Sequence, residues 1–338
     1  MTATTRQSTR QTLRGAVPAL VSTGAAVAVA YLTNLVVPAV SALTAAVVLG
    51  VLAGSTPVLS DRTRAVVARL TKRLLRAGVV LLGLQLALPA VLGLGPGVLV
   101  AVVVTVGITF AGTVALGRLV GVPRGLGLLV ATGFSICGAS AIAAMEDVVD
   151  REDSDVATAV ALVTLYGSLA IAAVPLLGGR LGLAGPRLGG WAGLSVHEVA
   201  QVVAAATPAG AAAIAVAVVV KLSRVVLLAP MVALVSVHER QRARKADTGA
   251  AKQAPMVPLF VLGFLAMVAL RTVDILPVPV LDLAKVASTL LLAGALFGLG
   301  CAVRLGPLVR TGGRALLLGL LSTLLIGTTS FVALAVLG

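Results

Sequence analysis

Three groups of polar residues lie inside apolar stretches that are long enough to cross a lipid bilayer. They are the run 133–140, the pair His197 and Glu198, and the pair Lys221 and Arg224. A charge at such depth is costly, and membrane proteins usually keep one for an ion or substrate path. These three groups are therefore where we expect the chemistry of this chain.

The run from Gly133 to Ser140 contains two glycines and two serines, which weaken a helix in the middle of a span. An interrupted helix would expose backbone N–H groups and the hydroxyls of Ser135 and Ser140, which together suit an anion. The alternative is close helix packing through small residues such as Gly138. Cys137, in the same run, is either a nucleophile or a small packing residue.

His197, Glu198 and Gln201 form the second group. Adjacent helical residues point in different directions, whereas Glu198 and Gln201 share a face. A buried carboxyl and an imidazole can both exchange protons, so these residues are candidates for proton coupling. The alternative is a buried ion pair between Glu198 and Lys221 or Arg224. The second His of an H-E-x-x-H zinc motif is replaced by Gln201, so we expect no metal site and no cofactor.

Lys221 and Arg224 are three residues apart and share one helical face. Two neighbouring cations need an anion, and an arginine can hold an oxyanion through two parallel N–H groups. The alternative for Arg224 is that its head reaches the aqueous interface. The expected substrate-binding residues are Ser135, Cys137, Gly138, Ser140, Lys221 and Arg224.

The composition is that of a membrane protein. Hydrophobic residues make up 59% of the chain and charged residues 11%, with a mean hydropathy of +1.11. The net charge of +14 comes from short basic clusters between apolar runs, which is typical of membrane loops rather than of nucleic-acid binding. Both cysteines lie in apolar spans, so no disulfide framework is expected.

Hydropathy predicts an all-α polytopic protein with about eleven transmembrane helices. The expected spans are 16–37, 39–54, 77–95, 97–117, 126–146, 155–177, 188–207, 210–236, 256–273, 283–303 and 315–337. Residues 1–15 form a cytoplasmic tail, and 16–338 form a single transmembrane domain. The first span resembles a signal peptide, and we expect it to stay uncleaved. Residues 61–76 predict an amphipathic helix at the inner surface, and 238–254 a basic cytoplasmic loop.

The basic clusters give the expected orientation. With the N-terminus inside the cell and the C-terminus outside, the cytoplasmic segments hold most of the lysines and arginines. This places the protein in the cytoplasmic membrane. The expected cytoplasmic clusters lie at 6–14, 62–76, 118–124, 180–187, 240–252 and 304–314, and the opposite side holds Arg151 with the acidic run 146–155.

Two segments echo each other. The sequence Ala77-Gly78-Val79-Val80-Leu81-Leu82-Gly83-Leu84 is similar to Ala293-Gly294-Ala295-Leu296-Phe297-Gly298-Leu299. By the expected threading they run in opposite directions, as in the inverted repeats of secondary transporters, whose sites lie at the bilayer midplane between discontinuous helices. The alternative is chance similarity between Leu- and Gly-rich helices.

The same residues carry a family resemblance. The run Phe134-Ser135-Ile136-Cys137-Gly138-Ala139-Ser140-Ala141-Ile142-Ala143-Ala144 resembles the signature of the YeiH-like family of proposed sulfate exporters. Residues 191–203, 221–225 and 76–83 are similar to further motifs of that family, in the same order. The chain departs from the family at Met145-Glu146-Asp147-Val148-Val149, where a Pro-Val-containing stretch is common. The resemblance implies a distant relation to bile-acid and arsenite transporters, with crossed, broken helices.

These observations favour a secondary transporter of a small anion, such as sulfate or another sulfur oxyanion, coupled to H⁺ or Na⁺. An anion channel and, less favoured, an intramembrane enzyme that uses Cys137 or His197 are the alternatives; we expect no enzymatic activity. The expected partners are the anion and the lipid bilayer, with no nucleic acid, and the sequence leaves a homo-oligomer open.

Overall fold

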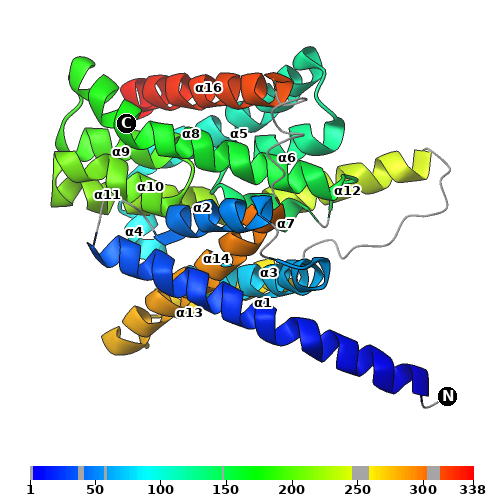
Figure 1. Cartoon of the computed structure of the whole chain (residues 1–338). Coiled ribbons are helices and arrows are strands. Elements are labelled where there is room, and N and C mark those ends of the chain that lie inside the picture. The colour runs from blue at the N-terminus through cyan, green and yellow to red at the C-terminus, as the bar shows by residue number, and fades with distance from the viewer. Residues whose placement is uncertain (1–2, 37–41, 57–58, 147, 246–258, 303–312) are drawn as a thin grey trace.

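The computed structural model describes residues 3–36, 42–56, 59–146, 148–245, 259–302 and 313–338, and in these ranges every regular element is a helix (Figure 1). The expected all-α class is therefore confirmed. Six helical segments are long and apolar enough to cross a membrane: Val17–Val36, Pro96–Val120, Ser154–Arg180, Ala211–Arg242, Val278–Cys301 and Gly313–Leu337. Two shorter apolar helices cover Ala45–Ser55 and Leu262–Thr272.

The helices form two groups that pack mainly within themselves. Bundle I contains α1 (Ala3–Val36), α2 (Ala42–Ser55), α3 (Asp61–Leu82), α13 (Leu259–Thr272) and α14 (Val278–Ala302). Small residues bring its helices together: a Cβ on Gly50 would lie 2.2 Å from the carbonyl oxygen of Phe297, and one on Gly54 2.5 Å from that of Cys301. The two echoing segments lie on α3 and α14, which pack antiparallel, because Gly78 contacts Leu292 while Thr71 contacts Gly298. This is the relative direction that an inverted repeat requires.

Bundle II is built on long helices that run between two faces of the molecule. It contains α5 (Pro96–Val120), α8 (Asp153–Arg180), α11 (Ala211–Val226), α12 (Leu228–Lys245) and α16 (Gly313–Leu337). Helices α5 and α16 are antiparallel, since Gly97 approaches Leu337 at one end and Gly121 approaches Arg314 at the other. We call the Gly121 end the first face and the Gly97 end the second face.

The expected span 126–146 is wrong as a single crossing. It forms α6 (Arg124–Ser135) and α7 (Ala139–Met145), and α7 folds back along α6. A Cβ on Gly133 would lie 2.8 Å from the Ile142 side chain, and one on Gly125 2.7 Å from the Asp150 carbonyl oxygen. Residues at both ends of this segment therefore meet at the first face. It is a helical hairpin, which we call hairpin 1.

The expected span 188–207 is also a hairpin, here called hairpin 2. Its helices are α9 (Gly185–Ser195) and α10 (Val199–Ala206), followed by the short η2 (Thr207–Ala209). Helix α9 runs parallel to α11, because Gly189 meets Ala213 and Gly193 meets Ala217. A tight turn at Gly210 joins η2 to α11, so α10 runs antiparallel to both. Hairpin 2 therefore opens at the second face.

The physical reason for both corrections is helix length. Hydropathy measures how long an apolar segment is, and not whether it reverses direction. At about 1.5 Å per residue, the 12 residues of α6 and the 11 of α9 extend only about 16–18 Å, roughly half of a bilayer core. Each hairpin therefore reaches the middle of the protein and returns.

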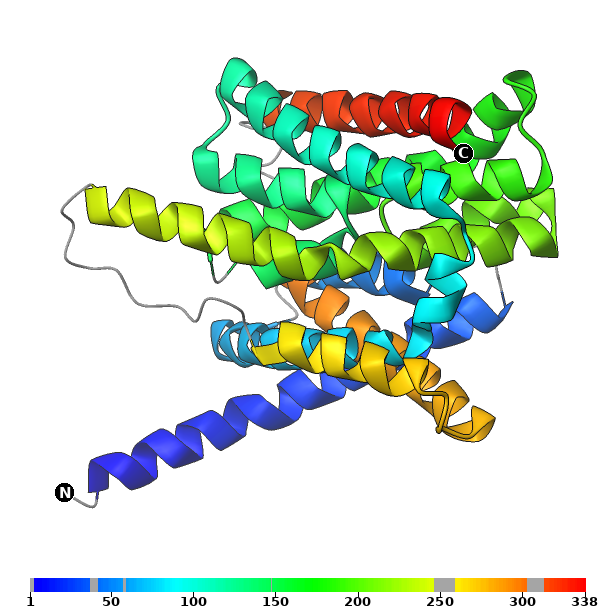
Figure 2. The same ribbon diagram turned by 180° about the vertical axis from the view of Figure 1, so that it is seen from behind.

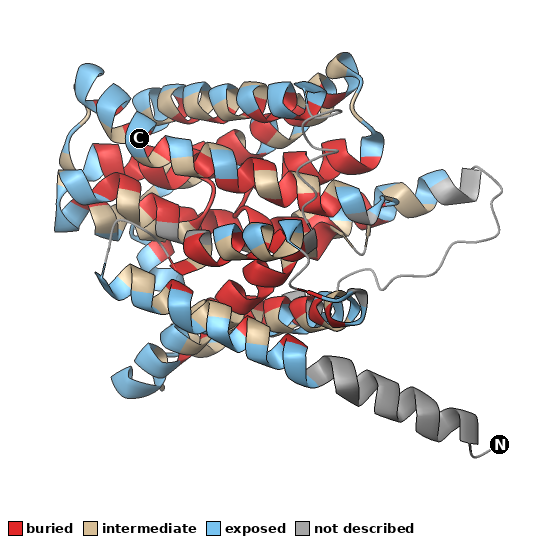
Figure 3. Cartoon of the chain, in the orientation of Figure 1, coloured by how far each residue is buried: buried red, intermediate tan, exposed pale blue. Residues whose placement is uncertain are grey.

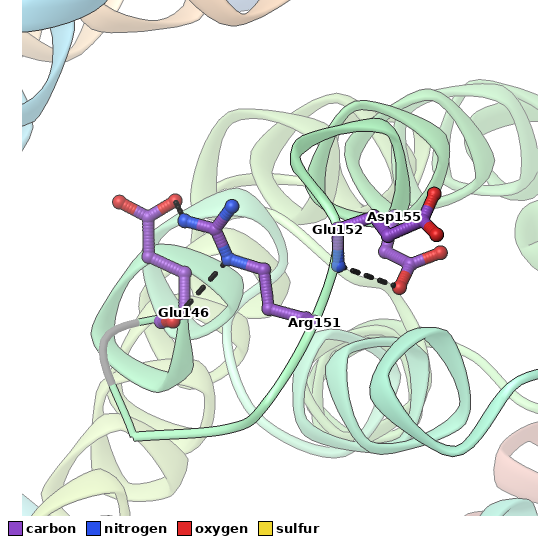
Figure 4. A network of polar contacts seen from close by, with 4 residues as sticks. All are labelled: Glu146, Arg151, Glu152 and Asp155. Atoms are coloured by element: carbon purple, nitrogen blue, oxygen red, sulfur yellow. Dashed lines mark hydrogen bonds and ion pairs between the residues drawn. The ribbon is translucent and has the colours of Figure 1, made fainter. Parts of the chain in front are cut away.

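This geometry moves several expected residues to the other face. Arg151 and the acidic run lie at the first face, where the guanidinium of Arg151 binds the carboxylate of Glu146 at 3.2 Å (Figure 4). Next to it, the Glu152 N–H donates to Asp155 in a capping box that starts α8. The residues that end α8 at Arg180, and Arg187 after it, lie towards the second face. The expected grouping of Arg180 and Arg187 with Arg118 was therefore wrong.

Other expected boundaries shift as well. The predicted amphipathic helix 61–76 is the first part of α3. The predicted span 77–95 completes α3 and then breaks into η1 (Gly83–Gln85) and α4 (Leu88–Leu92). Helix α1 already begins at Ala3, within the expected tail 1–15. In the expected loop 238–254, residues up to Lys245 continue α12, and the remainder lies outside the described residues, as do the basic positions 304 and 310.

Candidate functional site

The tips of the two hairpins meet in the buried centre of the protein (Figure 3). The ring of Phe134 on hairpin 1 lies 4.4 Å, between centroids, from the ring of His197 on hairpin 2. The backbone interruption expected at 133–140 is present at Ile136–Gly138, and a second one lies at Val196–Glu198. The resemblance implied crossed helices; the structure instead brings two hairpin tips together.

Arg224, on α11, binds both tips. Its guanidinium is fully buried and donates six hydrogen bonds of 2.6–3.1 Å, all of them to backbone carbonyl oxygens. A helix leaves its last carbonyls without an internal partner and carries partial negative charge there, so a cation is stabilising. The acceptors are Phe134 and Ser135 at the end of α6, and Gly193, Leu194 and Val196 at the end of α9.

Lys221 lies one turn earlier on α11 and acts in the same way. Its Nζ donates to the Ile136 carbonyl oxygen at 2.6 Å and to that of Val196 at 2.8 Å. Neither cation forms an ion pair with Glu198 in the described part of the chain. The two residues that were expected to bind substrate therefore hold the two hairpins together through their backbone.

Glu198 is placed at the opposite, positive ends of the broken helices. As the N-cap of α10 it accepts the Gln201 N–H, while the Gln201 amide oxygen accepts the Glu198 N–H at 3.2 Å. The carboxylate also faces the backbone N–H of Ala139, the first residue of α7. One carboxylate thus occupies the position at which we expected an anion to meet the helix N-termini.

Three buried polar side chains at this junction are incompletely satisfied. Both ring nitrogens of His197, one carboxylate oxygen of Glu198 and the amide nitrogen of Gln201 have no hydrogen-bond partner among the described residues. Buried polar groups are normally paired, so such a concentration needs an explanation. One explanation is that these side chains gain and lose protons or bound water while the protein functions.

A cavity of about 360 Å³ opens from the second face towards this junction, between bundles I and II. Ser140, Cys137 and Glu198 line its inner end, so three of the expected site residues reach it. Ser135 does not line the cavity, because its hydroxyl donates to the Thr132 carbonyl oxygen. The other five expected residues do not line the cavity: Gly138 and His197 at the hairpin tips, Gln201 on α10, and Lys221 and Arg224 on α11.

The cavity contains polar residues that the sequence analysis missed. Lys285, Ser288 and Thr289 line it from α14, and Gln85 lines it from η1. Lys285 is exposed and has no side-chain partner among the described residues, so it is an accessible cation. Their spacing in the sequence could have indicated this shared position. Lys285, Ser288 and Thr289 are at i, i+3 and i+4, which places all three on one face of an apolar helix.

A second, smaller cavity of about 190 Å³ lies between the same two bundles at the first face. It is lined by Arg76 of α3, and by Glu146 and Arg151 next to hairpin 1. Leu75 lines both cavities. The two cavities therefore approach each other from opposite faces, with Leu75 and the start of α7 between them.

Gly138, at the tip of hairpin 1, is a position that requires glycine for both its backbone conformation and its close contacts. Its φ of +73° lies in the left-handed region, and an added Cβ would lie 2.7 Å from Cγ of Glu198. We expect Gly138→Ala to lower the free energy of unfolding by about 1–3 kcal/mol. Gly179→Ala on α8, where an added Cβ meets nothing within 4 Å, is the matched control and is expected to be neutral or slightly stabilising. Thermal unfolding in detergent measures both; equal midpoints would contradict this account of the tip.

Comparison with known proteins identifies the family. A family model described as conserved hypothetical protein 698 matches residues 18–319. The chain belongs to this family. A relative in Corynebacterium glutamicum, a UPF0324 membrane protein, is 42% identical over 309 residues, which cover 91% of this chain and 89% of the relative.

Further members of the family are similar over most of the chain. A UPF0324 membrane protein of Bacillus cereus is 31% identical, covering 79% of this chain and 76% of its own length. A UPF0324 membrane protein of Agrobacterium fabrum is 33% identical, and the match covers 77% of this chain and 74% of the relative. The family resemblance seen in the motifs is thus confirmed. Together with the long apolar helices, these relatives identify a multi-pass membrane protein.

Proposed function

We propose that this protein is a secondary transporter that moves a small anion between two cavities on opposite faces of the membrane. The observation that carries the proposal is the pair of cavities between bundles I and II, separated near Leu75 and the hairpin tips. Alternating access requires a central site that opens to one side at a time, usually by movement of one bundle against another. A channel would instead need one continuous path.

An anion is favoured by the accessible cation of the cavity of about 360 Å³. The exposed ammonium of Lys285 lines it. The hydroxyls of Ser140, Ser288 and Thr289 line the same space, although each donates to a backbone carbonyl oxygen, those of Cys137, Gly78 and Lys285. A cation in such a polar lining suits a small oxyanion, and sulfate or another sulfur oxyanion is the substrate class that we propose. Cys137 also lines the cavity as a free thiol, and we propose that it contacts substrate without a catalytic role.

Proton coupling follows from the position of Glu198. A carboxylate and a substrate anion in one buried space repel each other, so binding of the anion favours the protonated form of Glu198. Release of the anion on the other side would then release the proton. His197 and Gln201, whose nitrogens lack partners beside Glu198, would connect this proton to water.

Sodium coupling at the hairpin tips is disfavoured by the same geometry. A bound sodium ion would need the carbonyl oxygens that end α6 and α9, and these already accept bonds from Lys221 and Arg224. The two side chains thus act as tethered cations at the centre of the protein. Their charge also favours an anion in the neighbouring cavity without direct contact.

We further propose nine membrane crossings and two hairpins that enter from opposite sides. The crossings are α1, α2, α3, α5, α11 with α12, α8, α13, α14 and α16. This number is odd, like the expected eleven, so the two termini lie on opposite sides of the membrane. We keep the proposed orientation, with the N-terminus cytoplasmic and the C-terminus extracytoplasmic in the cytoplasmic membrane, because the basic residues of 62–76, 118–124 and 240–245 lie on the side of the N-terminus. The two opposed hairpins are the feature that an inverted repeat would produce, within a single transport domain.

Lys285→Ala tests the proposed site. In proteoliposomes loaded with sulfate, we expect saturable counterflow of labelled sulfate, with KM raised at least about tenfold in the variant because a charge-assisted bond is lost. Lys285→Arg should retain most of the activity. Arg271→Ala, which removes a cation paired with Asp274 away from the cavity, should change nothing. Unchanged counterflow in Lys285→Ala would refute the site; conductance without counterflow would indicate a channel.

A further inference from the structure

A cavity larger than either of the two described above lies away from the proposed transport site. It measures about 730 Å³ and is lined by residues of α5 and α12 of bundle II and of α6 of hairpin 1. The ribbons of these helices are seen in Figure 2. None of its lining residues belongs to bundle I or to the hairpin tips. The transport proposal therefore gives it no role.

Its lining changes from apolar to cationic along the helices. On α5 the wall runs from Phe110 and Val114 to Arg118, over about 12 Å at 1.5 Å per residue. On α12 it runs from Leu234 to His238 in the same sense. The polar end of both helices is the first face. A ligand that fits this cavity must be apolar at one end and anionic at the other.

The polar end carries more positive than negative charge. Arg124 forms an ion pair with Glu239, so these two charges offset each other. Arg118 is exposed and has no side-chain partner among the described residues. The guanidinium of Arg314 lies close by, 3.4 Å from where a Cβ of Gly121 would be. Arginine binds phosphate through two parallel N–H groups, which makes a phosphate ester the favoured anion.

The position of the cavity in the membrane indicates whether this phosphate belongs to a lipid headgroup or is free in solution. Helix α5 is an apolar span of 25 residues, and Arg118 is in its last turn. The basic end therefore lies at the depth of lipid headgroups, and the wall formed by Phe110 and Val114 lies at the depth of the acyl chains. A membrane lipid reaches both depths at once, whereas a free phosphate would use only the basic end.

We propose that this cavity is a binding site for an anionic phospholipid, with the headgroup phosphate at Arg118 and an acyl chain against Phe110, Val114 and Leu234. The lipid would fill the groove between α12 and the α5–α6 pair. Because α6 leads into hairpin 1 and α12 continues from α11, which carries Arg224, the site adjoins both elements that build the central junction.

Native mass spectrometry of the purified, delipidated full-length protein tests the proposal. We expect phosphatidylglycerol to bind at least about tenfold more tightly than phosphatidylcholine. Arg118→Ala should weaken phosphatidylglycerol binding by at least about tenfold, since it removes a charge-assisted bond. Ala111→Trp, which fills the apolar end, should weaken it similarly. Arg180→Ala, at the end of α8 and outside the cavity, is the matched control and should have no effect.

Two outcomes would overturn the proposal. Equal binding of both lipids, or binding that is insensitive to Arg118→Ala, would show that the cavity does not select an anionic headgroup. Competition by inorganic phosphate at the same concentration, lost in Arg118→Ala and kept in Ala111→Trp, would assign the basic end to free phosphate instead. Thermal unfolding of each variant without lipid shows that the substitutions leave the fold intact, as expected for two exposed positions.

Discussion

Arg224→Met is expected to destabilise this protein more than any other single substitution at the hairpin tips. The variant keeps the bulk of the side chain but removes the guanidinium donors to five backbone carbonyls, those of Phe134, Ser135, Gly193, Leu194 and Val196. Of these, Val196 still accepts from Lys221. An unsatisfied buried acceptor costs about 1–3 kcal/mol, so the total loss exceeds about 4 kcal/mol even if some carbonyls find other partners. That loss is comparable with the whole stability of many proteins. The measurements are the monodisperse yield after purification and the thermal midpoint in detergent.

The conservative variant and a surface control sharpen this result. Arg224→Lys keeps the charge, but one ammonium lacks the planar fork that lets a guanidinium serve both tips. We expect it to remain clearly less stable than the parent protein. Arg271→Met, which removes a partly exposed arginine paired with Asp274, should shift the midpoint little. If Arg224→Met unfolded at the same temperature as the parent, the proposed role of Arg224 in joining the hairpins would be wrong.

Glu198→Gln is expected to separate anion exchange from proton coupling. Glutamine has nearly the same shape, and its amide oxygen can still accept the Gln201 N–H that starts α10. The variant should therefore fold, bind the anion and catalyse counterflow. It should lose uphill, pH-gradient-driven accumulation by at least about tenfold, because the amide cannot carry a proton. Flux assays in proteoliposomes with and without a pH gradient measure both activities.

The pH dependence gives a second readout with a defined sign. In the parent protein the anion binds when Glu198 is protonated, so counterflow should increase as pH falls. In Glu198→Gln this site is always uncharged, and the increase should disappear. Gln201→Glu, which adds a carboxyl one turn further along α10, is the matched variant and should keep a pH dependence. Gradient-driven accumulation that survives in Glu198→Gln would rule out Glu198 as the coupling group.

The sequence identified the residues of the central junction but not all their roles. Charges within apolar stretches are rare enough that Glu198, Lys221 and Arg224 could be found by type and depth alone. The Gly and Ser content of 133–140 predicted the interruption there. The bonds of Arg224 could not be predicted, because its acceptors are carbonyl oxygens from segments 28–31 and 89–90 residues away, and every residue has such an oxygen. Lys285 was missed because nothing local shows that α14 faces the hairpins.

What the sequence determined by itself is the class of the protein, its family, its helical content and the positions of its buried charges. Each follows from local properties, namely apolar length, composition and motif. The tertiary structure alone decided that two apolar segments are hairpins, that the faces of Arg151 and Arg180 are exchanged, and that the buried cations bind backbone. The reason is physical. A chain reversal needs only a few residues, such as Ile136–Gly138, and so few residues change the hydropathy profile little. The direction of the helix that follows is set by its packing against helices that are distant in the chain.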